Sequence, residues 1–109
     1  MKSDLQILVT NQAGVTVVKI SGEVRLDDDA EELHTVQDMH PQKVVIDASD
    51  LAFLASVGMR ILINFQRSIT AYGGTVRIAG LRPTIRKALQ EAKLLPLFDL
   101  RPDVASAMT

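Results

Sequence analysis

The strongest constraint on the fold is a short run of branched apolar residues, Val44-Val45-Ile46, bounded by Lys43 and Asp47. Polar and apolar residues do not alternate along this run, so a β-strand formed by it has no face suited to water. Such a strand belongs in the middle of a sheet, where other elements cover both of its faces. The run therefore favours an α/β fold.

The segment before this run predicts a β-hairpin followed by a helix. Apolar and polar residues alternate at residues 5–9, turn-forming residues occupy positions 11–14, and a β-branched run follows at residues 15–20. Five of the six residues at positions 27–32 are acidic, and carboxylates complement the positive end of a helix dipole. We expect these acidic residues to begin a helix that stops at Pro41.

The segment after the run predicts further helices and strands. Residues 56–72 have a helical period, and Gly73-Gly74 ends the helix. The predicted order ββαβαβαβα describes an α/β fold with a mixed sheet of about five strands and about four helices, in a single domain over residues 1–109. The later elements are a strand at 75–79, a helix from Pro83 to about Lys93, a strand at 98–100 and a helical turn at 102–108. The apolar stripe of the helix at 56–72 is Gly58, Ile61, Leu62, Phe65, Ile69 and Tyr72.

Composition excludes several classes of protein. The chain has no Cys, which excludes disulfides, thiol nucleophiles and thiolate metal sites. Its net charge of −1 lacks the basic excess of a nucleic-acid-binding protein, so no nucleic-acid partner is expected. No apolar run approaches the roughly 20 residues of a membrane span, and the first residues lack the apolar stretch of a signal peptide. We therefore expect a cytoplasmic protein that does not insert into a membrane.

The small net charge conceals an uneven distribution. Residues 1–59 carry four basic and ten acidic residues, a net charge of −6, whereas residues 60–109 carry eight basic and three acidic residues, a net charge of +5. Arg82, Arg86 and Lys87 lie together on one predicted helix and suit an anion or an acidic partner, although a solvated helix face explains them better. The molecule is expected to be polarised.

The sequence offers no recognisable catalytic constellation. His34 and His40 have no Ser, Cys or second His at helical spacing with which to form a triad or a metal site. Glu31 and His34 have the Glu-x-x-His spacing of a di-iron site, but such a site needs further carboxylates from other helices. No phosphate-loop pattern follows Gly73-Gly74. We therefore expect a protein that is not an enzyme and that has no metal and no cofactor.

One side of the helix at residues 56–72 combines the features of an interface. At about 100° per residue, a group of residues falls on a flank of the helix directed away from the core. The group contains two apolar side chains, two arginines and one hydroxyl, a mixture more typical of an interface than of a solvated helix face. Its members are Ser56, Met59, Arg60, Ile63 and Arg67.

The hydroxyl of Ser56 is well placed for phosphorylation. Ser56 stands at the start of the helix, where free N–H groups and the helix dipole favour a phosphate. The phosphate would add nearly two negative charges to a partly apolar contact surface and would switch off a bound partner. The alternative is that Ser56 only caps the helix, although position 59 lacks the Glu or Gln of a capping box.

Five stretches of the sequence match the pattern of a known family: VVKISGEV at 17–24, VVID at 44–47, FLASVGM at 53–59, GGTV at 73–76 and LLPLF at 94–98. Together they resemble the STAS family, which includes anti-sigma factor antagonists and domains at the ends of sulfate transporters. The resemblance covers nearly the whole chain and implies the STAS fold. In antagonists of this kind a serine is phosphorylated by an anti-sigma kinase, and the matching position here is Ser56.

The chain departs from the antagonist pattern next to this serine. The stretch usually reads as an apolar residue, Asp, Ser, Ser or Thr, Gly, Leu; here Ala55 replaces the Asp and Val57 follows Ser56. Arg25 replaces the Asp that commonly follows Gly-Glu-apolar, whereas Asp47 matches the strand-end carboxylate of the family. We place Arg25, Ala55 and Val57 on the partner-binding surface, where Arg25 fits an acidic partner or holds the phosphate.

The resemblance implies a partner-switching mechanism. The unmodified protein binds an anti-sigma factor that is a serine kinase of the ATPase type, phosphorylation of Ser56 releases this partner, and a serine phosphatase resets the protein. The chain is then a substrate and a binding module, either a monomer or a weak dimer. The alternative is a STAS adaptor that does not switch and docks on a transporter or a lipid-transport ATPase through the same helix flank.

Overall fold

The described chain, residues 6–24, 31–54 and 56–108 of this computed structural model, forms a six-stranded sheet. Five strands follow the order β1-β2-β3-β5-β6, and β4 pairs with β2 outside this path. β1 runs antiparallel to β2, and the other pairs of neighbours are parallel. The strands are β1 (Gln6–Gln12), β2 (Val15–Val24), β3 (Lys43–Asp47), β4 (Leu51–Leu54), β5 (Thr75–Ala79) and β6 (Asp99–Arg101).

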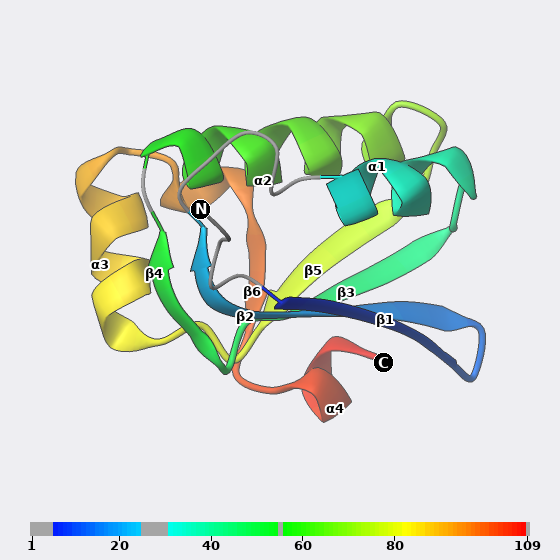
Figure 1. Ribbon diagram of the computed structural model, residues 1–109, viewed down its shortest axis with the longest axis horizontal. Coiled ribbons are helices and arrows are strands. Elements are labelled where there is room, and N and C mark those ends of the chain that lie inside the picture. The colour runs from blue at the N-terminus through cyan, green and yellow to red at the C-terminus, as the bar shows by residue number, and fades with distance from the viewer. Residues whose placement is uncertain (1–5, 25–30, 55, 109) are drawn as a thin grey trace.

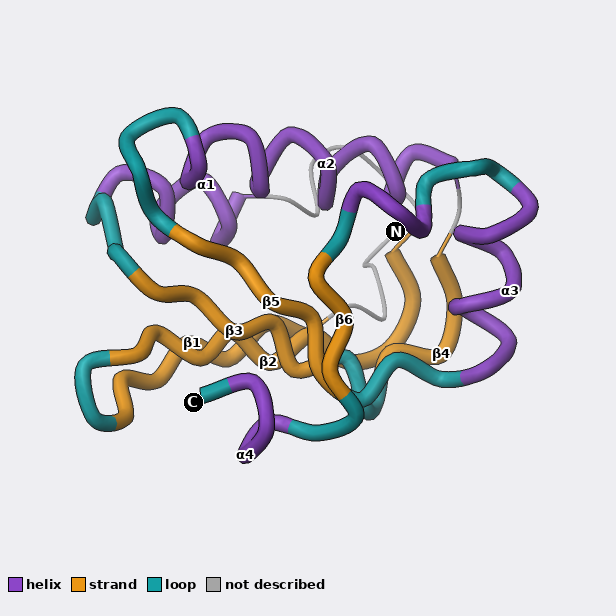
Figure 2. Tube along the Cα trace, turned by 180° about the vertical axis from the view of Figure 1, so that it is seen from behind, coloured by secondary structure: helices purple, strands orange, loops and turns teal. Residues whose placement is uncertain are grey.

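Helices cover both faces of the sheet (Figure 1). α1 and α2 lie side by side on one face, α4 lies on the opposite face, and α3 stands beside β4 at one end of the molecule. Figure 2 shows the same layers from behind. The helices are α1 (Glu31–Asp38), α2 (Ser56–Thr70), α3 (Pro83–Glu91) and α4 (Val104–Ala107), with a 3-10 turn η2 (Leu95–Leu97) before β6.

The burial of β3 explains its sequence. Val44 and Ile46 belong to the main core on the side of α1 and α2, whereas Val45 belongs to a smaller core that includes Ala107 of α4. All three β3 side chains are buried, so the prediction of a strand covered on both faces is confirmed. The place of β3 between β2 and β5 follows from this coverage.

The helix predicted at residues 56–72 is α2, and its apolar stripe faces the main core. The stripe lies over the sheet, and α2 contacts β5 in particular. Ile61 and Tyr72, which were predicted to belong to the stripe, are partly buried and pack against the core at its margin. The fully buried residues of α2 are Gly58, Leu62, Phe65 and Ile69.

The predicted element order omits one strand. Residues 51–54 were expected in a loop between the central strand and the long helix, but they form β4 and give the order ββαββαβαβα. β4 pairs with the distal part of β2, where a β-bulge between Gly22 and Glu23 shifts the register. All four residues of β4, LAFL, are apolar, and its two ends are buried while its middle is exposed. An apolar run this short does not distinguish a strand from a loop, so this strand depends on a tertiary partner that the local sequence does not reveal.

Replacing the central side chain of the core tests this packing. Phe65 is 1% exposed and is the largest fully buried side chain of the main core. We expect Phe65→Ala to lower the free energy of unfolding by about 3–5 kcal/mol, because the ring leaves a cavity that the sheet cannot close. Urea denaturation followed by circular dichroism measures this change. The neighbouring exposed Asn64 provides the control: Asn64→Ala should stay within about 0.5 kcal/mol of the wild type, and an equal loss in both variants would contradict the predicted packing.

Candidate functional site

Ser56 is the first residue of α2, and its side chain is exposed. β4 carries the chain from the sheet up to the helix layer, and α2 then runs back across the sheet (Figure 1). Within the described ranges the Ser56 hydroxyl has no hydrogen-bond partner. The buried stripe on the other side of α2 fixes the position of the helix, so Ser56 is presented at a defined place on the surface.

The residues predicted to surround Ser56 lie on one side of α2. Arg60 and Arg67 are exposed, and Val57 is partly buried. Arg25 and Ala55, which were assigned to the same surface, lie outside the described residues. We call the observed surface the α2 flank; its members are Ser56, Val57, Met59, Arg60, Ile63 and Arg67.

The α2 flank is less separated from the core than the sequence predicts. Met59 and Ile63 are partly buried and pack against the main core, although their helical positions were expected to point away from it. The segment around η2 approaches α2, because Gln66 Nε2 donates a hydrogen bond to the carbonyl oxygen of Leu97 at 2.7 Å, and Leu94 and Leu95 pack against the same core as Met59 and Ile63. The two arginines and Ser56 are therefore the exposed members of the flank.

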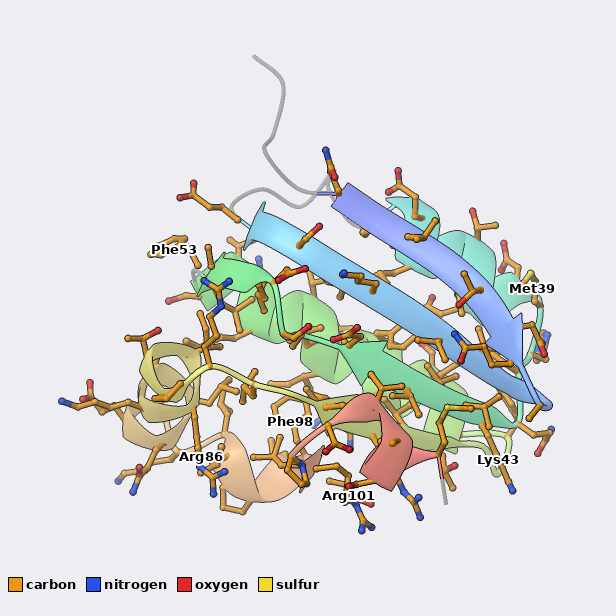
Figure 3. All side chains as sticks on the ribbon, turned by 90° about the horizontal axis from the view of Figure 1, so that it is seen from below. Met39, Lys43, Phe53, Arg86, Phe98 and Arg101 are labelled. Atoms are coloured by element: carbon orange, nitrogen blue, oxygen red, sulfur yellow. The ribbon has the colours of Figure 1, made fainter. Side chains whose placement is uncertain are left out.

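Two exposed apolar side chains adjoin the flank and were missed in the sequence. Phe53 is 41% exposed in β4, three residues before Ser56, and lies at the periphery of the molecule in Figure 3. Leu97 is 50% exposed next to Gln66. Large apolar side chains beside a polar surface are typical of contact sites. No periodicity reveals them, because β4 was not predicted and the 3-10 turn is too short to show a repeat.

The sequence interval that contains the flank carries charge of one sign. Residues 51–90 contain six basic residues and no Asp or Glu. This interval locates the basic residues more closely than the net charges of residues 1–59 and 60–109 do. This interval includes β4, α2, β5 and nearly all of α3. Of its basic residues, Arg82 is used within the fold, because its Nε donates to the carbonyl oxygen of Ser49 at 3.0 Å. The exposed arginines of the flank therefore lie in a sequence interval without Asp or Glu, and Glu23 of β2 lies in register with Phe53 of β4.

The carboxylate at the end of β3 organises the loop that leads to β4. Asp47 Oδ1 accepts hydrogen bonds from the backbone N–H of Ser49 at 3.1 Å and from its hydroxyl at 2.7 Å. Gly80 packs closely on Ser49, since a Cβ built at Gly80 would lie 3.2 Å from the Ser49 Cβ. Asp47 thus holds the turn that leads into β4, and its role as a supporting residue of the site stays a prediction.

The next carboxylate in this loop joins three segments. Asp50 Oδ2 lies 3.0 Å from Lys19 Nζ in β2, and Asp50 Oδ1 lies 3.9 Å from Arg82 Nη2 at the start of α3. The hydrogen bond and the charge of Lys19 hold the pKa of Asp50 below its usual value, and Asp50 raises the pKa of Lys19 in return. The sequence pattern does not single out Asp50, because its partners Lys19 and Arg82 are distant in the chain.

The described residues contain no group of three His, Asp or Glu side chains arranged to hold a metal ion. His34 Nδ1 interacts with Gln37 Oε1 at 3.2 Å, and the His40 ring packs against Tyr72 with ring centroids 5.0 Å apart. Both histidines therefore have local structural partners. No helix within the described ranges is long and apolar enough to cross a bilayer.

A mixed sheet with helices on both faces and an exposed serine at the start of α2 define a small α/β domain that presents a hydroxyl on its surface. The STAS domain model matches residues 6–107, and the chain belongs to the STAS domain family. The predicted fold is confirmed by this match and by the solved structures that share the architecture.

Proteins similar to this chain include anti-sigma factor antagonists. The chain is 24% identical over 107 residues to an anti-sigma F factor antagonist of Paenibacillus polymyxa, with 88% of each chain covered. Its sequence is 27% identical to that of an anti-sigma factor antagonist from Mycobacterium paratuberculosis whose crystal structure is known. The two structures superimpose with a TM-score of 0.83, over 96% of this chain and 92% of that one.

More distant structures share the fold alone. The phosphorylated form of the Bacillus cell fate determinant SpoIIAA is 19% identical, with a TM-score of 0.64 and coverage of 90% of this chain and 91% of that one. A sulfate transporter family protein from Wolinella succinogenes is 19% identical, with a TM-score of 0.77 and coverage of 90% and 84%.

The ion pair at Asp50 has a measurable consequence. We expect Lys19→Met to raise the pKa of Asp50 toward its usual value, because the hydrogen bond and charge that lower it are removed. Carboxyl-carbon NMR titration measures this directly. In the wild type the folded state favours the ionised Asp50, so the stability from this pair is present at neutral pH and is lost as the pH falls through the lowered pKa.

Asp103 provides an internal control in the same titration. Hydrogen bonds from Ser106 lower the pKa of Asp103, and Lys19 is not among the causes. Its pKa should be the same in the wild type and in the Lys19→Met variant. An unchanged pKa of Asp50 in the variant would show that this ion pair does not persist in solution.

Proposed function

We propose that this single STAS domain, residues 1–109, is a cytoplasmic anti-sigma factor antagonist that acts by partner switching. The observation that carries the proposal is the exposed Ser56 at the first position of α2. The names of the relatives from Paenibacillus polymyxa and Mycobacterium paratuberculosis support the general role. The unmodified protein binds a serine kinase of the ATPase type that is also an anti-sigma factor, and so regulates transcription.

The chemistry of the switch is a change of charge on the α2 flank. Phosphorylation of Ser56 places nearly two negative charges among side chains that are otherwise cationic or apolar. The phosphate lies at the N-terminus of α2, where backbone N–H groups and the helix dipole stabilise it. Arg60 is one helical turn away and comes within reach of the phosphate. The surface that attracts an acidic partner is thereby neutralised, and the partner dissociates.

The remaining residues support this contact without taking part in covalent chemistry. Arg67, Met59 and Ile63 extend the surface along α2, and Arg25, Ala55 and Val57 belong to the same partner-binding site. The kinase supplies the catalytic machinery, the γ-phosphoryl group of ATP is transferred to Ser56 Oγ, and a serine phosphatase removes it by hydrolysis. The chain itself acts as a substrate and not as an enzyme.

A second candidate function is a STAS adaptor that does not switch. The absence of the Asp before the serine, where Ala55 stands, favours this alternative, since part of the antagonist pattern is missing. Such an adaptor docks on a transporter or a lipid-transport ATPase through the α2 flank. Phosphorylation of Ser56 distinguishes the two functions, because it is expected of the antagonist and not of the adaptor.

The first test is phosphate transfer to a defined serine. We expect the wild type to gain one phosphate when it is incubated with its kinase and ATP, and Ser56→Ala to gain none, as measured by intact mass. Ser56→Asp should fail to bind the unmodified protein's partner, because it places a charge on the contact surface. Phosphate found on Ser49 or Ser68 would move the site, and an unmodified wild type would favour the adaptor.

Charge reversal on the flank tests the contact surface independently. Arg67 is exposed on α2, and Arg67→Glu should weaken binding of the kinase by about 1 kcal/mol, or roughly fivefold, mainly by slowing association. Surface plasmon resonance at two salt concentrations measures the rates. Arg86→Glu is the matched control, because Arg86 is an exposed arginine on α3. Equal losses in both variants would assign the effect to net charge and not to the flank.

A further inference from the structure

β1 forms an outer edge of the sheet, with β2 as its neighbour on one side (Figure 3). Its sequence, QILVTNQ, has neither a charged residue nor a proline. Leu8 is 61% exposed and Val9 is 38% exposed, so both faces of the strand carry accessible apolar surface. Native proteins commonly protect edge strands with charges, prolines, bulges or short length. β1 is seven residues long and has no charged residue and no proline.

The other edges of the described sheet are protected. β6 has three residues, of which Asp99 and Arg101 are charged, and Pro102 follows it directly. β4 has four residues and lies against α3. β1 is therefore the edge in the described part of the chain that is open to pairing.

The turn after β1 determines which of its backbone groups face outward. Ala13 and Gly14 both have positive φ angles, 53° and 81°, as a two-residue type I′ turn requires. In such a hairpin the closing pair, Gln12 and Val15, is a hydrogen-bonded pair, and the type of pair alternates along the ladder. The N–H and C=O groups of Asn11, and by the same alternation those of Val9 and Ile7, therefore point to the open side.

These outward groups are arranged so that the strand complements itself. An antiparallel pairing about a twofold axis at Val9 sets Val9 opposite the same residue of a second copy, and Ile7 opposite Asn11. All three positions present backbone donors and acceptors on the open side, so they meet their counterparts in register. Leu8 of one copy then lies opposite Thr10 of the other. Neither strand has a charged side chain, so no like charges oppose each other across the new pair.

We propose that β1 pairs with β1 of a second copy of this chain, which joins the two sheets into one continuous sheet. A second copy fits this edge because the register at Val9 pairs the outward groups of both strands and sets no like charges opposite each other. One strand edge is small beside a standard protein interface, so the dimer is weak and depends on concentration. Ser56 belongs to α2 in the helix layer, so the dimer presents two copies of the modifiable surface.

Two substitutions in β1 test the pairing by sedimentation equilibrium of the full chain from about 10 μM to about 1 mM. The average mass of the wild type should rise above 11.9 kDa toward twice that value. Val9→Pro removes an outward N–H and leaves the β1–β2 ladder its hydrogen bonds, so it should remain monomeric. Leu8→Lys should also remain monomeric, because two like charges are brought close across the twofold axis.

The control is Leu97→Lys, which places the same charge on an exposed apolar residue away from β1 and should associate like the wild type. Amide exchange adds the register: the N–H groups of Ile7, Val9 and Asn11 should exchange severalfold more slowly at the highest concentration. A wild type that stays at 11.9 kDa throughout, as expected if β1 pairs with a different protein, overturns the proposal. Self-association retained by Leu8→Lys, or lost in Leu97→Lys, overturns it as well.

Discussion

The structure depends on the burial of β3 from both sides. Val44 and Ile46 pack on one side with the stripe of α2, and Val45 packs on the other with α4. Because both faces are occupied, β3 and its neighbour β5 form a rigid base for α2. The α2 flank is then a surface of fixed geometry, and the hydroxyl of Ser56 is exposed at the first turn of the helix. Ser56 is exposed, so a chemical change at its hydroxyl alters this surface and not the buried core.

Charge determines what such a surface recognises. Residues 51–90 supply cations without carboxylates, while the acidic residues collect earlier in the chain. Asp50 stands at the boundary and pairs with Lys19 and Arg82, so the loop below Ser56 is held by its own ion pairs. In the proposed switch the enzymatic steps belong to the partners, and this separation of charge in the sequence lets a phosphate on Ser56 change the character of the α2 flank.

The parts of the fold that could be predicted are those in which local sequence and final burial agree. The β3 run and the α2 stripe are examples, since their patterns directly reflect the faces they bury. β4 could not be predicted, because it is stabilised by pairing with the bulged end of β2. The same limit applies to the site: helical geometry places Arg60 and Arg67 on the same side of α2 as Ser56, but the packing of Ile63 against the main core depends on tertiary contacts. The roles of Arg25 and Ala55 remain predictions from the family pattern.

The central claim is that the α2 flank is the contact surface of a kinase-type anti-sigma factor. Chemical-shift mapping of the ¹⁵N-labelled protein during titration with this partner tests it most directly. The account predicts that the amide signals that shift or broaden belong to β4, the first half of α2 and the segment at η2. The amide signals of α4 and β5 should be unaffected. Perturbations centred on α4, with Ser56 and Arg60 unchanged, would contradict the account.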